Sequence, residues 1–265
     1  MLAGTVLVGC TSGSGSGAGD ETGGTAGAPT GAGTGSGGGA TAGSGAGGSG
    51  AGASGGQATP AAGCPAAGGG VPAGAAQLTT IDLDGDGRPD VLWIASDGAD
   101  RSVGFTTASG ATSSLPVTLA GPQGATAFAL RPAPQDAADV LVSDGRVADL
   151  LTVQDCALVP VTDAGGQPWR FDLGFGDYGT GVGCLDLDGD GRTDLVGLNA
   201  RSQDDGDSYL ITRTVIDVAG TVARAGAGDE LHATRGTDDA AIETAHQITC
   251  GDRTADADGV HEPQG

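Results

Sequence analysis

The chain has 265 residues, 54 of them glycine, a formal net charge of −22 at pH 7 and only 3% aromatic residues. Proteins that bind nucleic acid need clustered Lys and Arg, so this charge excludes a nucleic-acid partner. The same charge is compatible with cation binding or with solubility alone. No segment approaches the roughly 18 consecutive apolar residues of a membrane-spanning helix.

The first ten residues, MLAGTVLVGC, form a short apolar run that ends in Cys10. The run resembles the lipobox of bacterial lipoproteins, where the cysteine is lipidated and becomes the new N-terminus after cleavage. The resemblance implies an exported protein whose only contact with a membrane is a lipid on Cys10. Because no basic residue precedes the apolar run, we expect the natural start to lie upstream. The alternative is a chance cysteine after a few apolar residues.

Residues 11–62 consist almost only of Gly, Ala, Ser and Thr. Such a segment cannot bury enough apolar surface to offset its conformational entropy, so it is predicted to be a disordered linker. As a flexible coil of about 50 residues it would have an end-to-end distance of roughly 40 Å. The folded domain is expected at residues 63–253, and residues 254–265 are expected to form a flexible tail.

Four cysteines remain within the predicted domain. In an exported protein they are candidates for two disulfides, and four cysteines allow three connectivities. We favour Cys156–Cys184 together with Cys64–Cys250, because the second bond would tie the two ends of the domain together. A zinc site is disfavoured because the sequence has no CxxC motif and only one histidine, His246, near a cysteine.

The domain reads as an internal repeat of short strands. Strand–turn–strand patterns begin at Asp90, Asp139 and Asp194, and a weaker echo lies at residues 246–252. Runs rich in Val, Leu, Ile and Thr between Gly, Asp and Ser clusters are typical of all-β proteins. Repeats of this length indicate a modular β fold.

Two near-identical acidic loops precede the first and third repeats: DLDGDGRPD at residues 82–90 and DLDGDGRTD at residues 186–194. Carboxylates at positions 1, 3, 5 and 9 of a tightly curled loop can turn their oxygens towards one centre, as Ca²⁺ requires. Glycines at positions 4 and 6 permit the curl. The predicted calcium ligands are the side chains of Asp82, Asp84, Asp86, Asp90, Asp186, Asp188, Asp190 and Asp194, with the main-chain carbonyls of Arg88 and Arg192, whose guanidinium groups are expected to point outwards.

The acidic motif has two alternative interpretations. The motif can be only a polar turn, since Asp and Gly are common turn residues, but two copies in matching register favour the metal. An EF-hand requires a bidentate Glu at position 12 between two helices. Position 12 is Trp93 in one loop and Gly197 in the other, and both lie in predicted strands. An EF-hand is therefore disfavoured.

The pattern D-x-D-x-D-G-x-x-D between strands resembles the FG-GAP/VCBS repeat family, whose members build β-propellers like the head of integrin α chains. The resemblance implies that the loop aspartates and the position-7 carbonyl bind calcium. It also implies a propeller-like repeat of three to four short blades, which is either irregular, an open stack of sheets, or completed by a partner that covers its edge strands. The middle repeat, preceded by APQDAAD, has lost its ligands.

No nucleophile is evidently paired with the histidines of this chain, so no catalysis is expected. The leading interpretation is a calcium-stabilised adhesion or scaffold protein that contacts a surface protein or a glycan. The alternative is a calcium-dependent module that recognises a glycan or surface polymer, and a hydrolase ranks third. Four aromatic residues are candidates for a sugar-binding face, although a place in the core is favoured: Trp93, Trp169, Phe175 and Tyr178.

Overall fold

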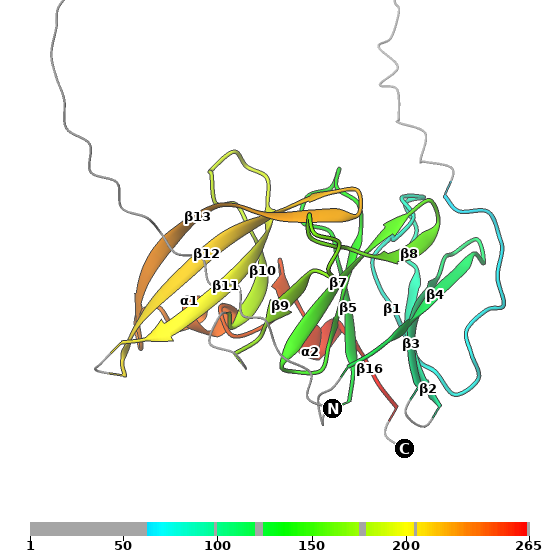
Figure 1. Ribbon diagram of the computed structural model, residues 1–265, viewed down its shortest axis with the longest axis horizontal. Coiled ribbons are helices and arrows are strands. Elements are labelled where there is room, and N and C mark those ends of the chain that lie inside the picture. The colour runs from blue at the N-terminus through cyan, green and yellow to red at the C-terminus, as the bar shows by residue number, and fades with distance from the viewer. Residues whose placement is uncertain (1–62, 98–99, 120–123, 175–178, 204–205, 264–265) are drawn as a thin grey trace, which may run out of the picture. The chain divides into compact units, whose positions relative to one another are not determined.

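The structure, a computed structural model, describes residues 63–97, 100–119, 124–174, 179–203 and 206–263. Cys10, the predicted linker at 11–62, Phe175 and Tyr178 lie outside these residues. The described part of the chain is mainly β-structure in antiparallel sheets, with two short helices (Figure 1). Neither described helix is long and apolar enough to cross a membrane.

The first sheet is a four-stranded antiparallel meander in chain order. Its strands are β1 (Ala76–Thr79), β2 (Val91–Asp97), β3 (Asp100–Thr106) and β4 (Thr112–Val117). The central strands β2 and β3 carry the most deeply buried side chains of this sheet, and four of them belong to one apolar cluster: Leu92, Ile94, Val103 and Phe105. The acidic loop at residues 82–90 joins β1 to β2.

The second sheet contains the same meander, made of β5 (Thr126–Leu130), β6 (Asp139–Ser143), β7 (Val147–Gln154) and β8 (Ala157–Pro160). Two further strands extend it: β9 (Arg170–Asp172) pairs with β7, and β16 (Val260–His261) pairs with β5. Every residue of β6 is buried. This sheet is therefore covered on both of its faces.

The third sheet is again a meander, made of β10 (Gly181–Leu185), β11 (Asp194–Ser202), β12 (Ser208–Ala219) and β13 (Val222–Thr234). The second acidic loop joins β10 to β11. Helix α1 (Asp239–Thr244) follows, and Ile242 on this helix is buried in an apolar cluster with Val196 and Ile211 of the sheet.

The C-terminal segment differs from the prediction. The weak fourth repeat is only a two-stranded ribbon of β14 (Thr249–Cys250) and β15 (Arg253–Thr254). Residues 254–263 are not a tail but contain α2 (Ala255–Asp258) and β16. Val260 is buried against the first and second sheets, and Glu262 forms an ion pair with Arg101 of β3. Pairing with a distant strand, which local sequence does not reveal, accounts for the difference.

Alternation along the strands of the second sheet decides which neighbour each face contacts. Ala127, Ala129, Val140 and Val142 belong to an apolar cluster that includes Leu92, Ile94, Val103 and Phe105 of the first sheet. Residues one position along, Phe128, Leu130 and Leu141, belong to a cluster with Val182, Leu195 and Ile216 of the third sheet. Successive side chains of a strand point to opposite faces, so the second sheet packs between the other two.

The two disulfides correct the predicted pairing: Cys64 is bonded to Cys156, and Cys184 to Cys250. Cys156 lies in the tight turn between β7 and β8, and β8 is placed beside the first sheet by the bond from the Leu158 N–H to the Ser113 hydroxyl of β4. Cys184 lies on β10, next to the ribbon that carries Cys250. The two ends of the domain are therefore not tied to each other: each disulfide joins segments that the packing of the sheets brings together. Disulfides are typical of an oxidising, extracytoplasmic compartment.

Candidate metal centre

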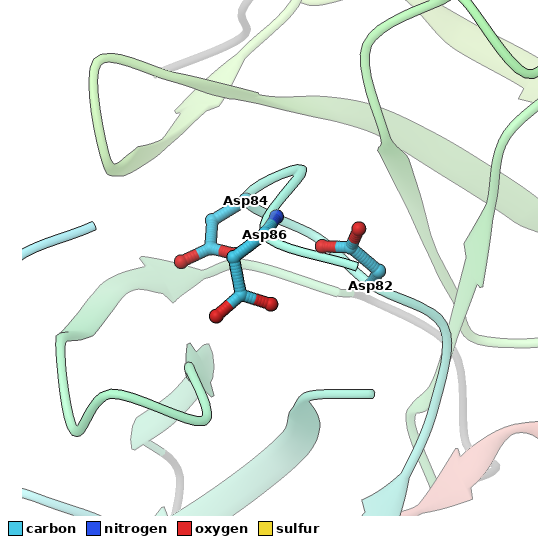
Figure 2. A group of neighbouring side chains, drawn as sticks. All are labelled: Asp82, Asp84 and Asp86. Carbon is cyan, nitrogen blue, oxygen red and sulfur yellow. The ribbon is translucent and has the colours of Figure 1, made fainter. Parts of the chain in front are cut away.

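Each acidic loop gathers three carboxylates. Asp82, Asp84 and Asp86 each offer one oxygen within 4.8 Å of the others, and so do Asp186, Asp188 and Asp190. The first three side chains project from one loop between β1 and β2 (Figure 2). Carboxylate oxygens grouped in this way are the ligands that hard divalent cations prefer.

The same backbone conformation produces both groups. The glycines at loop positions 4 and 6 have φ of +80° and +82° in the first loop and of +75° and +87° in the second. This left-handed region is costly for residues with a Cβ, so the motif needs glycine at both positions. The sequence argument for the curl is thus confirmed by the backbone.

Main-chain N–H groups also fix the carboxylates in the same pattern. The position-1 aspartate accepts the N–H of both glycines, at 2.7 and 2.8 Å in the first loop and at 2.8 and 3.0 Å in the second. The position-5 aspartate accepts the N–H of the following arginine, at 2.8 and 2.7 Å. Each carboxylate oxygen keeps a further lone pair with which it can bind a cation.

The position-9 aspartates lie outside the two carboxylate groups. Asp90 is only 1% exposed, and its two oxygens accept the N–H groups of Leu83, at 2.7 Å, and Ala108, at 2.9 Å. Burial raises the pKa of Asp90, the two N–H groups oppose this, and Asp84 and Asp82 add to it. The pKa of Asp194 is also raised by burial and by Asp188, while the Leu187 N–H opposes the rise. In both loops, position 9 accepts a hydrogen bond from position 2.

The first loop is the more enclosed of the two. Its three grouped aspartates are half-buried, whereas Asp186, Asp188 and Asp190 are exposed. The Cys64 N–H donates to Asp84 at 2.7 Å, and the Arg131 guanidinium donates to the Asp82 carbonyl at 2.6 Å. The segment fixed by the Cys64–Cys156 disulfide thus covers one side of the first loop.

The middle loop, residues 131–138 between β5 and β6, begins with Arg131, and its following residues contact the second acidic loop. Arg192 forms an ion pair with Asp136 at 3.5 Å, and the Thr193 hydroxyl donates to the Pro132 carbonyl. The Arg192 guanidinium is thus turned towards its neighbour rather than simply outwards. Arg88, at the same position of the first loop, is exposed.

The middle loop has the length of the second loop, with Asp139 at position 9, but it lacks the hydrogen bond from position 2. That position is Pro132, which has no N–H. Asp139 is 4% exposed, and its Oδ1 has no hydrogen-bond partner among the described residues. Burial raises the pKa of Asp139 to about 7, partly opposed by the Thr152 hydroxyl, with a further rise from Asp136. Sequence reasoning missed this residue, although a proline at position 2 of the aligned loops was the signal.

Two of the aromatic candidates for a sugar-binding face can be placed. Trp93 is 1% exposed and lies in the first sheet against Gly104, so it belongs to the core as favoured. Trp169 is partly buried and packs edge-on against Phe171, with ring centroids 6.4 Å apart. A buried indole such as that of Trp93 offers no face to a sugar ring.

Comparison with protein-family models, with curated proteins and with solved structures finds no match for this chain. The geometry alone therefore defines the class of site: two acidic loops, at the same place in two sheets, that can each hold a divalent cation.

Proposed function

We propose that this chain is a calcium-binding β-repeat protein that is exported, anchored by a lipid on Cys10, and serves a non-catalytic adhesion or scaffold role. Calcium would hold each acidic loop in shape between the first and second strands of its sheet. The anchor and the linker would place the domain away from the membrane surface. This role needs no catalytic group, since the ion would act on the fold.

One observation carries the proposal: two loops 104 residues apart have the same triad of aspartates, the same positive φ at two glycines and the same N–H bonds. A polar turn needs only one of these carboxylates to accept N–H groups. Three carboxylates within 4.8 Å of one another repel each other, a cost that bound Ca²⁺ would offset. The ligand set is all oxygen, which favours Ca²⁺ or Mg²⁺ over softer metals.

Thermal unfolding of the oxidised full chain, measured across a calcium titration with magnesium as the parallel titration, tests this role. Calcium-binding extracellular modules have dissociation constants of about 10⁻⁴–10⁻³ M. A cation at about 100 times its dissociation constant adds roughly 2.7 kcal/mol per site. We expect Tm to rise with calcium and not with magnesium. Ca²⁺ accepts a flexible set of oxygen ligands, whereas Mg²⁺ requires short bonds in near-ideal octahedral geometry.

Variants assign the rise to the loops. Asp84→Ala and Asp188→Ala should each remove about half of the calcium-dependent stabilisation, and the double variant should remove all of it. Asp252→Ala, which changes an exposed aspartate outside both triads, is the matched control. A rise that survives in the double variant, or no rise in the unmodified protein, would refute calcium binding by the loops.

We also propose the finer architecture, a propeller-like arrangement in which each four-stranded meander is a blade. Support comes from the four-stranded meander that the three sheets share and from the acidic or middle loop at the same junction of each. Propellers typically have four to eight blades, so three would leave an incomplete ring or an open stack that a partner completes. A crystal structure of the chain with calcium tests whether the sheets surround a common axis.

Glycan recognition is the alternative function, and the buried position of Trp93 counts against an aromatic sugar platform built on it. Retention on immobilised polysaccharides, with and without chelator, separates the two functions. We expect no calcium-dependent retention. Retention that chelator abolishes and that Asp84→Ala and Asp188→Ala weaken would replace the scaffold role by glycan binding.

A further inference from the structure

A cavity of about 340 Å³ lies between the middle loop, the second acidic loop, the end of β7 and strand β12. Five aspartates and one arginine supply its charged lining: Asp136, Asp139, Asp190, Asp194, Asp217 and Arg192. Its apolar lining includes Val153, Leu195 and Val215. The cavity therefore combines strong negative charge with walls that can accept methylene groups.

In the lining of this cavity, one oxygen of Asp139 accepts no hydrogen bond from the described residues. Its side chain is 4% exposed, it lines the cavity, and its Oδ1 has no partner among the described residues. A buried polar atom without a partner costs about 1–3 kcal/mol, and a charged one costs more. In the flanking repeats a main-chain N–H supplies this hydrogen bond, but Pro132 cannot. A donor from outside the chain would satisfy Asp139.

The arrangement of the carboxylates tells which kind of cation fits. Among the described residues, the carboxylate oxygens that meet within 4.8 Å in groups of three are those of the two acidic loops, and Asp139, Asp136 and Asp217 belong to neither group. Spread-out carboxylates do not enclose a bare metal ion, which needs six or more oxygens at about 2.3–2.6 Å. They suit a larger cation that carries several N–H donors.

We propose that this cavity binds a primary alkylammonium group, with Asp139 accepting its N–H and the apolar walls contacting its alkyl chain. The ammonium has three donors and no acceptor, which matches a cavity rich in carboxylates. Arg192 is held by Asp136 at the edge of the cavity, so it competes for the same charge. The source of the ammonium is either a free polyamine or a lysine side chain of another protein.

The two cation sites are coupled, because Asp190 and Asp194 belong to both the second acidic loop and the cavity. A divalent cation in the loop neutralises part of the negative charge of Asp190 and Asp194, which lowers the affinity of the cavity for a second cation. By thermodynamic linkage, each cation weakens the binding of the other by the same factor. The alkylammonium site does not depend on the proposed calcium role, since Asp139 and Asp217 remain when the loop is filled.

Titration calorimetry of the oxidised full chain with spermidine, at about pH 8 and low salt, tests the proposal; N-acetyl-lysine amide is the second probe. We expect one spermidine per chain, and Asp139→Asn and Asp217→Asn should each weaken it about tenfold or more. Arg192→Gln should strengthen it by removing the competing cation. Tighter binding of N-acetyl-lysine amide would assign the site to a lysine side chain, and tighter binding of spermidine to a free polyamine.

Two controls keep failure interpretable. Tetramethylammonium has the same single positive charge as N-acetyl-lysine amide but no N–H, and it should not bind at this site. Asp188→Asn alters the second acidic loop without lining the cavity, so it should abolish the calcium response of that loop and leave spermidine binding. Binding that Asp139→Asn leaves unchanged, or equal binding of tetramethylammonium, would overturn the proposal and leave only the general attraction of an acidic surface.

Discussion

The middle loop and the two acidic loops occupy the same junction of three similar sheets, yet they differ in the hydrogen bonds to the aspartate at position 9. In the acidic loops, the position-2 N–H of Leu83 or Leu187 donates to the position-9 aspartate. In the middle loop, Pro132 has no N–H to donate, and one oxygen of Asp139 has no partner within the described part of the chain. The residue at position 2 therefore decides whether the position-9 carboxylate accepts a main-chain N–H within its own loop or can accept a donor from a ligand.

The two acidic loops differ from each other in their surroundings rather than in their backbone. The first is covered by the segment that carries Cys64 and by Arg131 at the start of the middle loop, while the second is exposed and its Arg192 pairs with Asp136 of the same loop. Burial strengthens electrostatic interactions because water screens them less. We therefore expect the first loop to bind its cation more tightly and with less sensitivity to salt.

The largest expected effect comes from removing the cover of the first loop. Cys64→Ser with Cys156→Ser opens a loop of 92 residues and should lower the free energy of unfolding by about 4–5 kcal/mol. The matched pair, Cys184→Ser with Cys250→Ser, closes 66 residues and should cost nearly as much. Urea unfolding of the two double variants provides the measurement.

The calcium response separates these double variants. In an Asp188→Ala background, in which only the first loop remains, loss of the Cys64–Cys156 bond should weaken calcium binding, and loss of the other bond should not. Equal calcium affinity in both variants would show that the cover does not distinguish the two acidic loops.

The second prediction concerns the pH dependence that Asp139 imposes. Its pKa is about 7 when folded and about 3.9 when unfolded, so the folded state holds the proton more tightly between these values. Stability attributable to this group is full below about pH 4 and falls by about 1.4 kcal/mol per pH unit until about pH 7. Asp139→Asn should remove that fall and stabilise the protein at neutral pH.

Unfolding of the unmodified protein and the variant across this range tests the prediction, with Asp252→Asn as the control for a lost surface charge. Asp139→Asn is expected to stabilise the fold and to weaken alkylammonium binding. Unfolding of the variant therefore cannot explain its weaker binding. Parallel pH profiles would contradict the raised pKa.

A third change restores the missing donor of the middle loop. Pro132→Ala supplies an N–H at position 2, and a hydrogen bond to a charged group contributes about 1.5–3 kcal/mol. The loss of proline costs about 0.4–1 kcal/mol through the unfolded chain. We expect a net gain of roughly 1 kcal/mol above pH 7, a lower pKa of Asp139, and weaker spermidine binding. Pro134→Ala, an exposed proline of the same loop, should show only the cost.

A fourth prediction, of similar size, tests whether the acidic loops share one backbone conformation. Gly87→Ala and Gly191→Ala add a Cβ that meets nothing within 4 Å, so their cost comes only from φ of +82° and +87°. Each should destabilise the protein by about 1–2 kcal/mol. Gly69→Ala, also in open space but without positive φ, should cost little. A difference of more than about 1 kcal/mol between the two loop variants would contradict a common conformation.

The sequence alone predicted the features that depend on neighbouring residues. The alternation of β-branched runs and Asp-Gly turns predicted a mainly β domain. The spacing of aspartates and glycines predicted two curled loops, and three of the four predicted carboxylates lie together in each, because only residues within nine positions are involved. The repeat at Asp90, Asp139 and Asp194 marked the same junction in each of three sheets.

The tertiary structure decided what depends on distant segments. It paired Cys64 with Cys156, made residues 260–261 a strand beside β5, and covered the first acidic loop while exposing the second. It also buried Asp139 in a cavity whose walls come from four separate parts of the chain. Such contacts depend on how whole sheets pack. The free energy of that packing comes from many residues far apart in the sequence, so a short motif does not predict it.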